Sequence, residues 1–320
     1  MQQFQDQKNN KEPFLTLICR CTVSLLLVLL TQFTLSLVPR CFSTSPLLLQ
    51  LALSVVVLLL VLVFGRWFRL ILGVYASAPA FVFFNILFVW GLYWVVIRRA
   101  IPHLISAVFS GEVVMLFIGL CSILSSDPGF VSYGSSYSDN CDEMKALEVE
   151  ARNEDSFQLK RVRYCKICKA YIKGFDHHCP AFGNCIGQNN HILFMVLLLG
   201  FLSTEASYIL CSFQFARDSH IFDGTRFENG LGGSLVISTM LFTLLQVLWQ
   251  AVFMAWHIYC ICFNIRTDEW VSLRINWKKY SEFQVIIQSQ SGGSFAQMQF
   301  MNPYDKGILQ NVKEFFAVGD

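Results

Sequence analysis

The chain has 320 residues, of which 54% are hydrophobic and only 14% are charged. Charged residues make up about a quarter of an average soluble globular domain, so this composition argues against a soluble protein. The net charge of +2 is too small to indicate a nucleic-acid-binding protein. The hydrophobic residues fall instead in blocks of about 20, the length that crosses a bilayer as a helix.

The N-terminal part combines a polar start with two apolar segments. Residues 1–13 are polar, and the apolar segments within residues 14–64 are Phe14–Val38 and Leu47–Phe64. Arg20 lies inside the first of them, which leaves open whether this segment spans the membrane or begins only after Arg20. A cleaved signal peptide is disfavoured because no small-residue cleavage site stands out and further spans follow.

Four stronger apolar segments follow and are predicted to be the core transmembrane helices. They lie within residues 81–124 and 192–263 and are Phe81–Ile97, Leu104–Leu124, Ile192–Phe213 and Ser234–Phe263. The fold class predicted from this pattern is an all-α polytopic membrane protein with four core helices and two N-terminal ones.

Two acids, Glu112 and Glu205, lie inside predicted spans. Glu205 lies about 21 Å along a helix past His191, too deep to act on the cysteine-rich segment that precedes the helix. We therefore predict a structural role between helices. A transporter would show several ionisable groups along a pathway, and two isolated glutamates do not meet that description.

Basic residues flanking the spans predict the orientation, because they gather on the cytosolic side. Ten of them lie near the central segment or after the last span: Lys160, Arg161, Arg163, Lys166, Lys169, Lys173, Arg266, Arg274, Lys278 and Lys279. The linker 125–156, the cysteine-rich domain 157–191 and the tail 264–320 are therefore predicted to be cytosolic. An even number of spans puts the N-terminus on the same side. Arg98 and Arg99 fall on the opposite side and count against this orientation.

The twelve cysteines divide into two groups. Eight are scattered and are interpreted as free thiols: Cys19, Cys21, Cys41, Cys121, Cys141, Cys211, Cys260 and Cys262. Most of these lie in or beside apolar segments, where free cysteine behaves as a small hydrophobe. The other four cluster with two histidines in a basic segment: Cys165, Cys168, Cys179 and Cys185. In a reducing compartment such a cluster indicates metal binding or catalysis rather than disulfides.

The cluster contains one recognisable half of a zinc site, the C-x2-C pair of Cys165 and Cys168. The other half has two possible compositions. Cys179 and Cys185 complete a four-cysteine site that leaves both histidines unused. Alternatively, Cys185 and one histidine complete the site and leave Cys179 free.

Alternation along the sequence DHHC distinguishes the two histidines. In an extended segment successive side chains point to opposite sides, so His177 and Cys179 share one side while His178 faces the other. One imidazole can then bind metal while its neighbour meets a free thiol, as a nucleophilic cysteine requires. Asp176 would orient His177. The spacing alone leaves a purely structural four-cysteine knuckle as the competing interpretation.

The stretch DHHCPAFGNCIGQNN, with CKIC before it, resembles the DHHC family of membrane protein S-acyltransferases (palmitoyltransferases). Asp127–Gly129 is similar to the family's DPG motif. Arg266–Glu269 resembles its TTxE motif, with arginine in place of the first threonine. Asn302 and Asn311 resemble its C-terminal motif, so the resemblance covers roughly residues 81–316.

The resemblance implies that Cys179 is the nucleophile, His177 the base and Asp176 its orienting partner. It implies one structural zinc site with four ligands: Cys165, Cys168, His178 and Cys185. Asn190 and Phe194 match the family's N-x3-F motif. The implied reaction moves palmitate from palmitoyl-CoA through Cys179 to cytosolic cysteines of membrane-associated proteins, in the endomembrane system or the plasma membrane.

The sequence also departs from the family pattern. The positions of the family's second zinc site hold other residues: Ala151, Glu154, Tyr164 and Tyr171. One carboxylate cannot hold a metal alone, so we predict one zinc ion rather than two. The two tyrosine rings are expected to fill the vacated volume. The tryptophan common after the DHHC-Pro pair is replaced by Ala181, with Phe182 next to it.

Three lysines near the cysteine cluster could meet the phosphates of coenzyme A: Lys166, Lys169 and Lys173. The alternative is that they only follow the positive-inside rule or touch lipid headgroups. The alternative function is a membrane protein whose structural zinc knuckle recruits partners, or a degenerate acyltransferase. A RING-type module is disfavoured because the segment lacks ligands for two four-ligand zinc sites.

Overall fold

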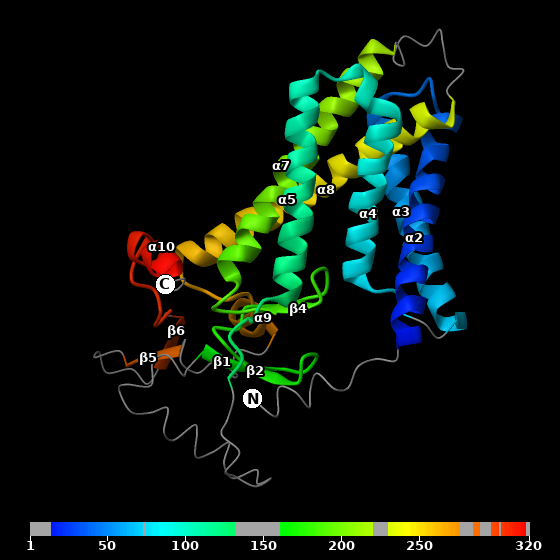
Figure 1. The fold of residues 1–320 in the computed structure, drawn as a ribbon. Helices are drawn as coiled ribbons and strands as arrows, with labels where there is room; N and C mark the ends of the chain where they lie inside the picture. The colour runs from blue at the N-terminus through cyan, green and yellow to red at the C-terminus, as the bar shows by residue number, and fades with distance from the viewer. Residues whose placement is uncertain are drawn as a thin grey trace. The chain divides into compact units, whose positions relative to one another are not determined.

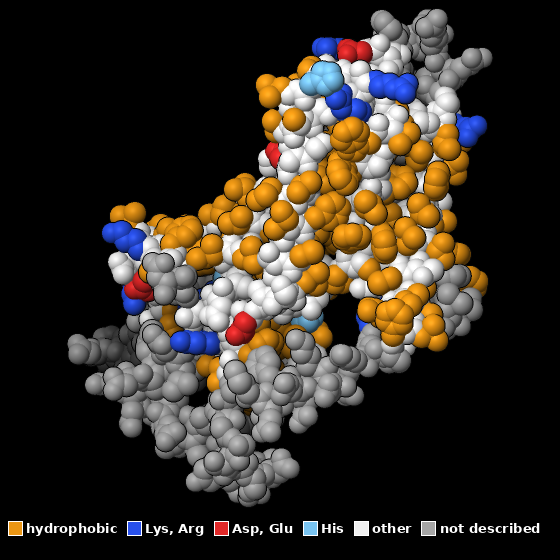
Figure 2. All heavy atoms as spheres, viewed as in Figure 1, with side chains coloured by type: hydrophobic (Ala, Val, Ile, Leu, Met, Phe, Trp, Pro, Cys, Tyr) orange, Lys and Arg blue, Asp and Glu red, His pale blue; other side chains and the backbone are white. Residues whose placement is uncertain are grey.

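The computed structural model describes residues 14–72, 75–131, 161–219, 230–275, 284–288, 296–300 and 302–317 (Figure 1). Six helical segments within these ranges are long and apolar enough to cross a membrane. Five are the helices α2 (Phe14–Cys41), α3 (Leu47–Leu72), α5 (His103–Ser125), α7 (His191–Asp218) and α8 (Leu231–Cys262). The other is α4 (Ala78–Leu92) together with the two short helical turns that continue it to Ala100. The predicted polytopic helical fold, with the cysteine-rich segment between α5 and α7, is confirmed. Figure 2 shows hydrophobic side chains covering the visible sides of the helices.

Several helices extend beyond the predicted segments. Helix α2 runs through Arg20 without a break, so it does not begin after that residue. Helix α3 continues past Phe64 to Leu72 because neither Gly65 nor the residues after it interrupt the backbone. Helix α4 begins at Ala78, where the hydroxyl of Ser77 accepts a hydrogen bond from Ala80 N. It continues as a π-helical turn (Tyr93–Ile97) and a 3-10 turn (Arg98–Ala100).

The chain divides into two compact units. The first contains Met1–Gly119, Pro180–Phe182 and Leu199–Ala251, and the second contains Leu120–Cys179, Gly183–Leu198 and Val252–Asp320. The first unit is helical, and α2 packs against both α3 and α4 within it. The second unit carries three two-stranded hairpins and the short helices α9 (Thr267–Ile275) and α10 (Ile308–Ala317).

The core of the first unit centres on three aromatic rings. The ring centroid of Tyr93 lies 4.5 Å from that of Phe109, which lies 6.1 Å from that of Tyr208. The buried Tyr208 hydroxyl shares a hydrogen bond of 2.7 Å with Thr239 Oγ1. Phe182 is also buried in this unit and stacks on Phe201 at 6.4 Å, beside the alanine that replaces the family's tryptophan.

Both acids inside the apolar helices have a hydrogen-bond partner on a neighbouring helix. Glu205 Oε1 accepts a hydrogen bond from Gln250 Nε2 at 2.7 Å, and Glu112 Oε1 accepts one from Ser203 Oγ at 2.9 Å. Such bonds between helices contribute about 0.6 kcal/mol each within a membrane. These contacts agree with the structural role expected for both glutamates, which stays a prediction.

The second unit begins with two antiparallel hairpins. Strand β1 (Val162–Cys165) pairs with β2 (Ala170–Lys173), and β3 (His177–Cys179) pairs with β4 (Asn184–Ile186). The DPG turn lies beside them, because Lys173 N donates to Gly129 O at 2.8 Å. The third hairpin joins β5 (Gln284–Gln288) to β6 (Ala296–Phe300).

Gly187 marks a close approach of three backbone segments in the second unit. A Cβ atom at this position would lie 2.3 Å from Pro128 O and 2.7 Å from Ile172 Cγ2. We expect Gly187→Ala to destabilise the protein by about 1–3 kcal/mol or more, because neighbouring backbone would have to move. Thermal unfolding of the detergent-solubilised protein measures the effect. Gly111→Ala is the control, since a Cβ there meets nothing within 4 Å; equal midpoints for the two variants would contradict the prediction.

Candidate active site and metal centre

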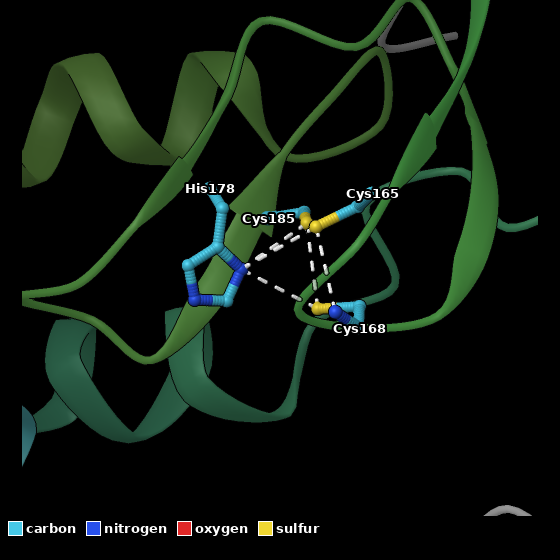
Figure 3. A group of neighbouring side chains, drawn as sticks. All are labelled: Cys165, Cys168, His178 and Cys185. Carbon is cyan, nitrogen blue, oxygen red and sulfur yellow. Dashed lines mark hydrogen bonds between the residues drawn. The ribbon is translucent and has the colours of Figure 1, made fainter.

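Three cysteines and one histidine converge between the first two hairpins. Figure 3 shows the side chains of Cys165, Cys168, His178 and Cys185 pointing toward one another. Cys165 ends β1, His178 lies in β3, Cys185 lies in β4, and Cys168 lies in the turn after β1. One ligand atom from each residue lies within 4.8 Å of the others.

The distances within this group fit a tetrahedral zinc ion. His178 Nδ1 lies 3.8 Å from Cys165 Sγ and 3.4 Å from the sulfurs of both Cys168 and Cys185. Zinc bound about 2.1 Å from nitrogen and 2.3 Å from sulfur separates its ligands by roughly 3.6–3.8 Å. The observed distances agree with this within a few tenths of an ångström. The Cys185 thiol also donates toward Cys168 and lowers the pKa of Cys168 to about 5, which favours a thiolate there. That the group binds zinc stays a prediction.

The positions expected to have lost a second zinc site are only partly described. Ala151 and Glu154 lie outside the described residues. Tyr164 and Tyr171 are directly opposed across β1 and β2, with their ring centroids 5.1 Å apart. The rings therefore pack against each other, as cross-strand aromatic pairs do. The number of zinc ions is not decided by this packing.

The other side of β3 carries His177 and Cys179, and Asp176 directly precedes this strand. Asp176 Oδ2 lies 2.8 Å from His177 Nδ1, and Asp176 is completely buried. A hydrogen bond also joins the side chains of His177 and Cys179, and Cys179 is only 7% exposed. The extended strand separates these residues from His178, which faces the cysteine group. Such an arrangement can serve a cysteine nucleophile with a base and an orienting carboxylate, and these roles stay a prediction.

Asp176 is held by the start of α9. Its Oδ1 accepts a hydrogen bond of 2.9 Å from Thr267 N, and its carbonyl oxygen accepts one of 2.9 Å from Asp268 N. Burial raises the pKa of Asp176, but the hydrogen bond from His177 and the fields of nearby histidines outweigh burial and hold it well below its usual value. Asp176 is therefore an ionised carboxylate whose orientation depends on the TTxE-like segment.

The same segment supplies a buried ion pair. Arg161 Nε and Nη2 lie 2.8 and 3.0 Å from the two carboxylate oxygens of Glu269. Arg161 also donates to Asn264 Oδ1 at 2.6 Å, and its guanidinium lies 3.7 Å from the ring centroid of Tyr304. Glu269 Oε2 accepts a further hydrogen bond from Arg266 N. A bidentate pair of this kind fixes both partners in orientation as well as position.

The C-terminal motif binds the end of α8. Asn302 Nδ2 donates to Phe263 O at 2.6 Å, and Asn311 Nδ2 donates to Cys262 O at 2.8 Å. These amides satisfy carbonyl groups that a helix end leaves without a partner inside the helix. The two asparagines singled out in the sequence thus anchor the tail to the segment that carries Arg266 and Glu269.

Arg161→Met is expected to cost about 3–5 kcal/mol, because it leaves the Glu269 carboxylate buried and unpaired. The side chains of Arg161 and Glu269 are only 13% and 4% exposed. The double variant Arg161→Met/Glu269→Leu should recover part of the loss in thermal stability. Arg217→Met is the control, since its partner Asp218 is 43% exposed and exposed pairs contribute about 0–1 kcal/mol. Equal losses for Arg161→Met and Arg217→Met would contradict the prediction.

His177 has an unusual proton affinity. Burial lowers its pKa, but hydrogen bonds with Asp176 and Cys179 outweigh burial and raise it to about 9. His177 therefore holds a proton at neutral pH. A pKa raised on folding adds stability that is present below about 6.5 and is lost as the pH rises to about 9. We expect the thermal midpoint of the wild type to fall over this range, by the equivalent of about 2–3 kcal/mol, more than that of His177→Gln. Parallel pH curves would contradict this.

His257 is a site residue that the sequence interpretation did not consider. It is completely buried in α8, with its ring centroid 5.8 Å from that of His177. A histidine inside a predicted span is itself a signal for function. The sequence interpretation applied this signal only to the acids in the spans. The three lysines proposed for coenzyme A lie in the β1–β2 hairpin. Lys166 and Lys169 are exposed and Lys173 is half-buried in β2.

Comparison with known proteins agrees with this geometry. Residues 152–274 match the profile of the family described as DHHC palmitoyltransferase. The chain is 26% identical over 235 residues to Palmitoyltransferase ZDHHC17 of Mus musculus, covering 65% of this chain and 35% of that protein. It is 25% identical over 244 residues to Probable protein S-acyltransferase 15 of Arabidopsis thaliana. This match covers 72% of this chain and 87% of that protein. The chain thus spans about a third of the length of the mouse relative.

Proposed function

We propose that this chain, whose residues 152–274 belong to the DHHC palmitoyltransferase family, is a protein S-acyltransferase that moves palmitate from palmitoyl-CoA to cysteines of other proteins. The observation that carries the proposal is the pairing of the buried Asp176 with the half-buried His177, beside the buried Cys179, on the strand whose other side faces the cysteine group. The geometry favours this function over the structural four-cysteine knuckle, because Cys179 is not a member of the metal-competent group.

The reaction is a covalent relay of two steps. In the first, the Cys179 thiolate attacks the thioester carbonyl of palmitoyl-CoA and forms an acyl-enzyme. Coenzyme A leaves as a thiolate and takes the proton that His177 holds. In the second, a substrate thiol gives its proton to His177 and attacks the acyl-enzyme, and Cys179 leaves as a thiolate. Each cycle therefore restores the imidazolium–thiolate pair.

The cysteine group would hold a zinc ion with a structural role. Its four ligands are Cys165, Cys168, His178 and Cys185, which leave no open position for substrate or water. Bound zinc would contribute folding energy and hold β1 and β2 against β3 and β4. Since β3 carries His177 and Cys179, the metal site supports the catalytic residues without touching the reacting atoms.

The six apolar helices make this a multi-pass membrane protein. We place the active site on the cytosolic side, where the basic residues near the cysteine cluster belong by the positive-inside rule, in the endomembrane system or the plasma membrane. The acyl chain would enter a cavity between α4, α5, α7 and α8, whose walls include Val89, Phe109, Phe201 and Tyr208. Lys166 and Lys169, which are exposed, would meet the phosphates of coenzyme A.

Labelled palmitoyl-CoA tests the proposal on the purified full chain. The wild type should acquire a label that hydroxylamine removes, because a thioester is labile to it. Cys179→Ala should acquire no label and still contain the tightly bound zinc ion of the cysteine group. Cys121→Ala, which removes an exposed cysteine outside the cluster, should label normally. An unlabelled wild type, together with zinc loss in Cys179→Ala, would instead favour the structural knuckle.

A further inference from the structure

His257 is buried in a way that calls for a partner. Its side chain is completely buried in α8, and neither ring nitrogen has a hydrogen-bond partner among the described residues. The nearest aromatic neighbours are apolar: the ring centroids of Phe253 and Phe194 lie 4.5 and 5.0 Å away. A buried polar group without a partner is costly, and a bound ion or water is a common explanation.

The nearest polar groups are those of the catalytic pair. Asp176, His177 and His257 each offer one ligand atom, and these atoms all lie within 4.8 Å of one another. We propose that the three residues form a second metal site, which binds a divalent transition-metal ion such as Zn²⁺ reversibly and switches off the base while it is occupied. The switching half of this proposal rests on the proposed acyltransferase function, whereas the binding half does not.

The donor set suits such an ion. Two imidazoles and one carboxylate are a known zinc-binding set that leaves a fourth position open, and imidazole nitrogen favours zinc, copper and nickel. This site shares no ligand with the cysteine group, and it does not use the positions of the family's lost second zinc site. Asp176 directly precedes β3, His177 begins it and His257 comes from α8, so ligands far apart in the chain meet only in the folded unit.

Metal binding would block the base through the tautomer of His177. Its Nδ1 already faces Asp176 Oδ2 at 2.8 Å, so Nδ1 is the nitrogen that can share an ion with this carboxylate. A metal on Nδ1 replaces the proton there and releases it to solvent. The remaining proton then stays on Nε2, and the imidazole has no lone pair left to accept a proton from a thiol.

The proposed site should bind metal less tightly than the cysteine group does. It carries one formal negative charge, compared with three thiolates in the cysteine group. The Arg266 guanidinium is also close, because Arg266 Nη1 lies 2.6 Å from His191 Nδ1, and the His191 ring centroid lies 6.1 Å from that of His257. Fewer charged ligands and a nearby cation both lower affinity for a cation. Occupation should therefore follow the free zinc concentration.

Metal counting tests the binding half without any activity. Full-length Cys179→Ala, which lacks the nucleophile, is dialysed against zinc buffers and the bound metal is measured. One tightly held equivalent and a second, exchangeable equivalent are expected. Adding His257→Gln should remove the exchangeable equivalent and keep the tight one, which also reports a folded cysteine group. Adding His103→Gln is the control, since His103 contacts Arg98 and is no part of the cluster. Failure to find the second equivalent, or its retention in His257→Gln, overturns the site.

Zinc inhibition tests the switching half. Acyl-enzyme formation by the wild type should fall as free zinc rises and recover after chelation. In His257→Gln the zinc concentration that halves labelling should rise by more than about tenfold, as expected when metal affinity is lost. Zinc binding without inhibition would support the metal site but contradict the proposal that the bound metal blocks the base. A chain that forms no acyl-enzyme even without added zinc would contradict the proposed function, while the metal count still decides the site.

Discussion

Asp176→Asn should slow acyl-enzyme formation by roughly four orders of magnitude, by analogy with the orienting carboxylate of serine proteases. The reason lies in the two hydrogen bonds of the carboxylate, from Thr267 N to Oδ1 and from His177 Nδ1 to Oδ2. An asparagine oxygen would still accept from Thr267 N, which turns the amide NH2 toward His177. His177 Nδ1 must then accept a hydrogen bond, the proton moves to Nε2, and the ring can no longer take a proton from a thiol.

Single-turnover labelling with palmitoyl-CoA measures this effect, with the zinc content as a check on folding. Asp176→Asn should retain one tight zinc ion, because Asp176 belongs to the other side of β3. Asp218→Asn is the matched control, since Asp218 is exposed and paired only with the neighbouring Arg217. A labelling rate within tenfold of the wild type would show that the carboxylate does not set the tautomer of His177.

Cys185→Ser is expected to release the tight zinc ion and unfold the two hairpins around it. The Cys185 side chain is completely buried and lies 3.4 Å from both Cys168 Sγ and His178 Nδ1. Structural zinc contributes about 10–16 kcal/mol of apparent binding free energy in zinc-finger peptides, more than the stability of most domains. Acyl-enzyme formation should be lost together with the metal, although Cys185 does not contact the reacting atoms.

Hydrogen exchange and limited proteolysis localise this loss, and metal analysis measures it. Protection should disappear in residues 161–190 of Cys185→Ser, and treatment of the wild type with a strong chelator should give the same pattern. The helices should keep their protection from hydrogen exchange, because hydrophobic packing and the membrane stabilise them without the zinc site. Cys121→Ser, at an exposed cysteine of α5, should change neither zinc nor protection. Retention of zinc by Cys185→Ser would refute the four-ligand assignment.

Much of this molecule could be predicted from local sequence. The helices α2, α3, α4, α5, α7 and α8 follow from apolar blocks long enough to cross a bilayer, since backbone hydrogen bonds inside a membrane must be satisfied within a helix. The division of the cysteine-rich segment also follows from local pattern. If the segment DHHC is extended, its side chains alternate, so the sequence predicts that His178 faces away from His177 and Cys179. These are properties of neighbours in the chain, and that is why a single sequence reveals them.

Other features depend on contacts between distant residues, and no local pattern encodes them. Asp176 is held by Thr267 N across 91 positions, and Arg161 pairs with Glu269 across 108. The sequence singled out Asp176 and the TTxE-like segment, but it did not show that the backbone of this segment holds the Asp176 carboxylate. In the sequence, His257 is one residue of an apolar segment far from Asp176 and His177. Only the folded structure brings the three residues together. Residue type and spacing determine which groups are available, whereas side-chain packing in three dimensions decides which of them meet.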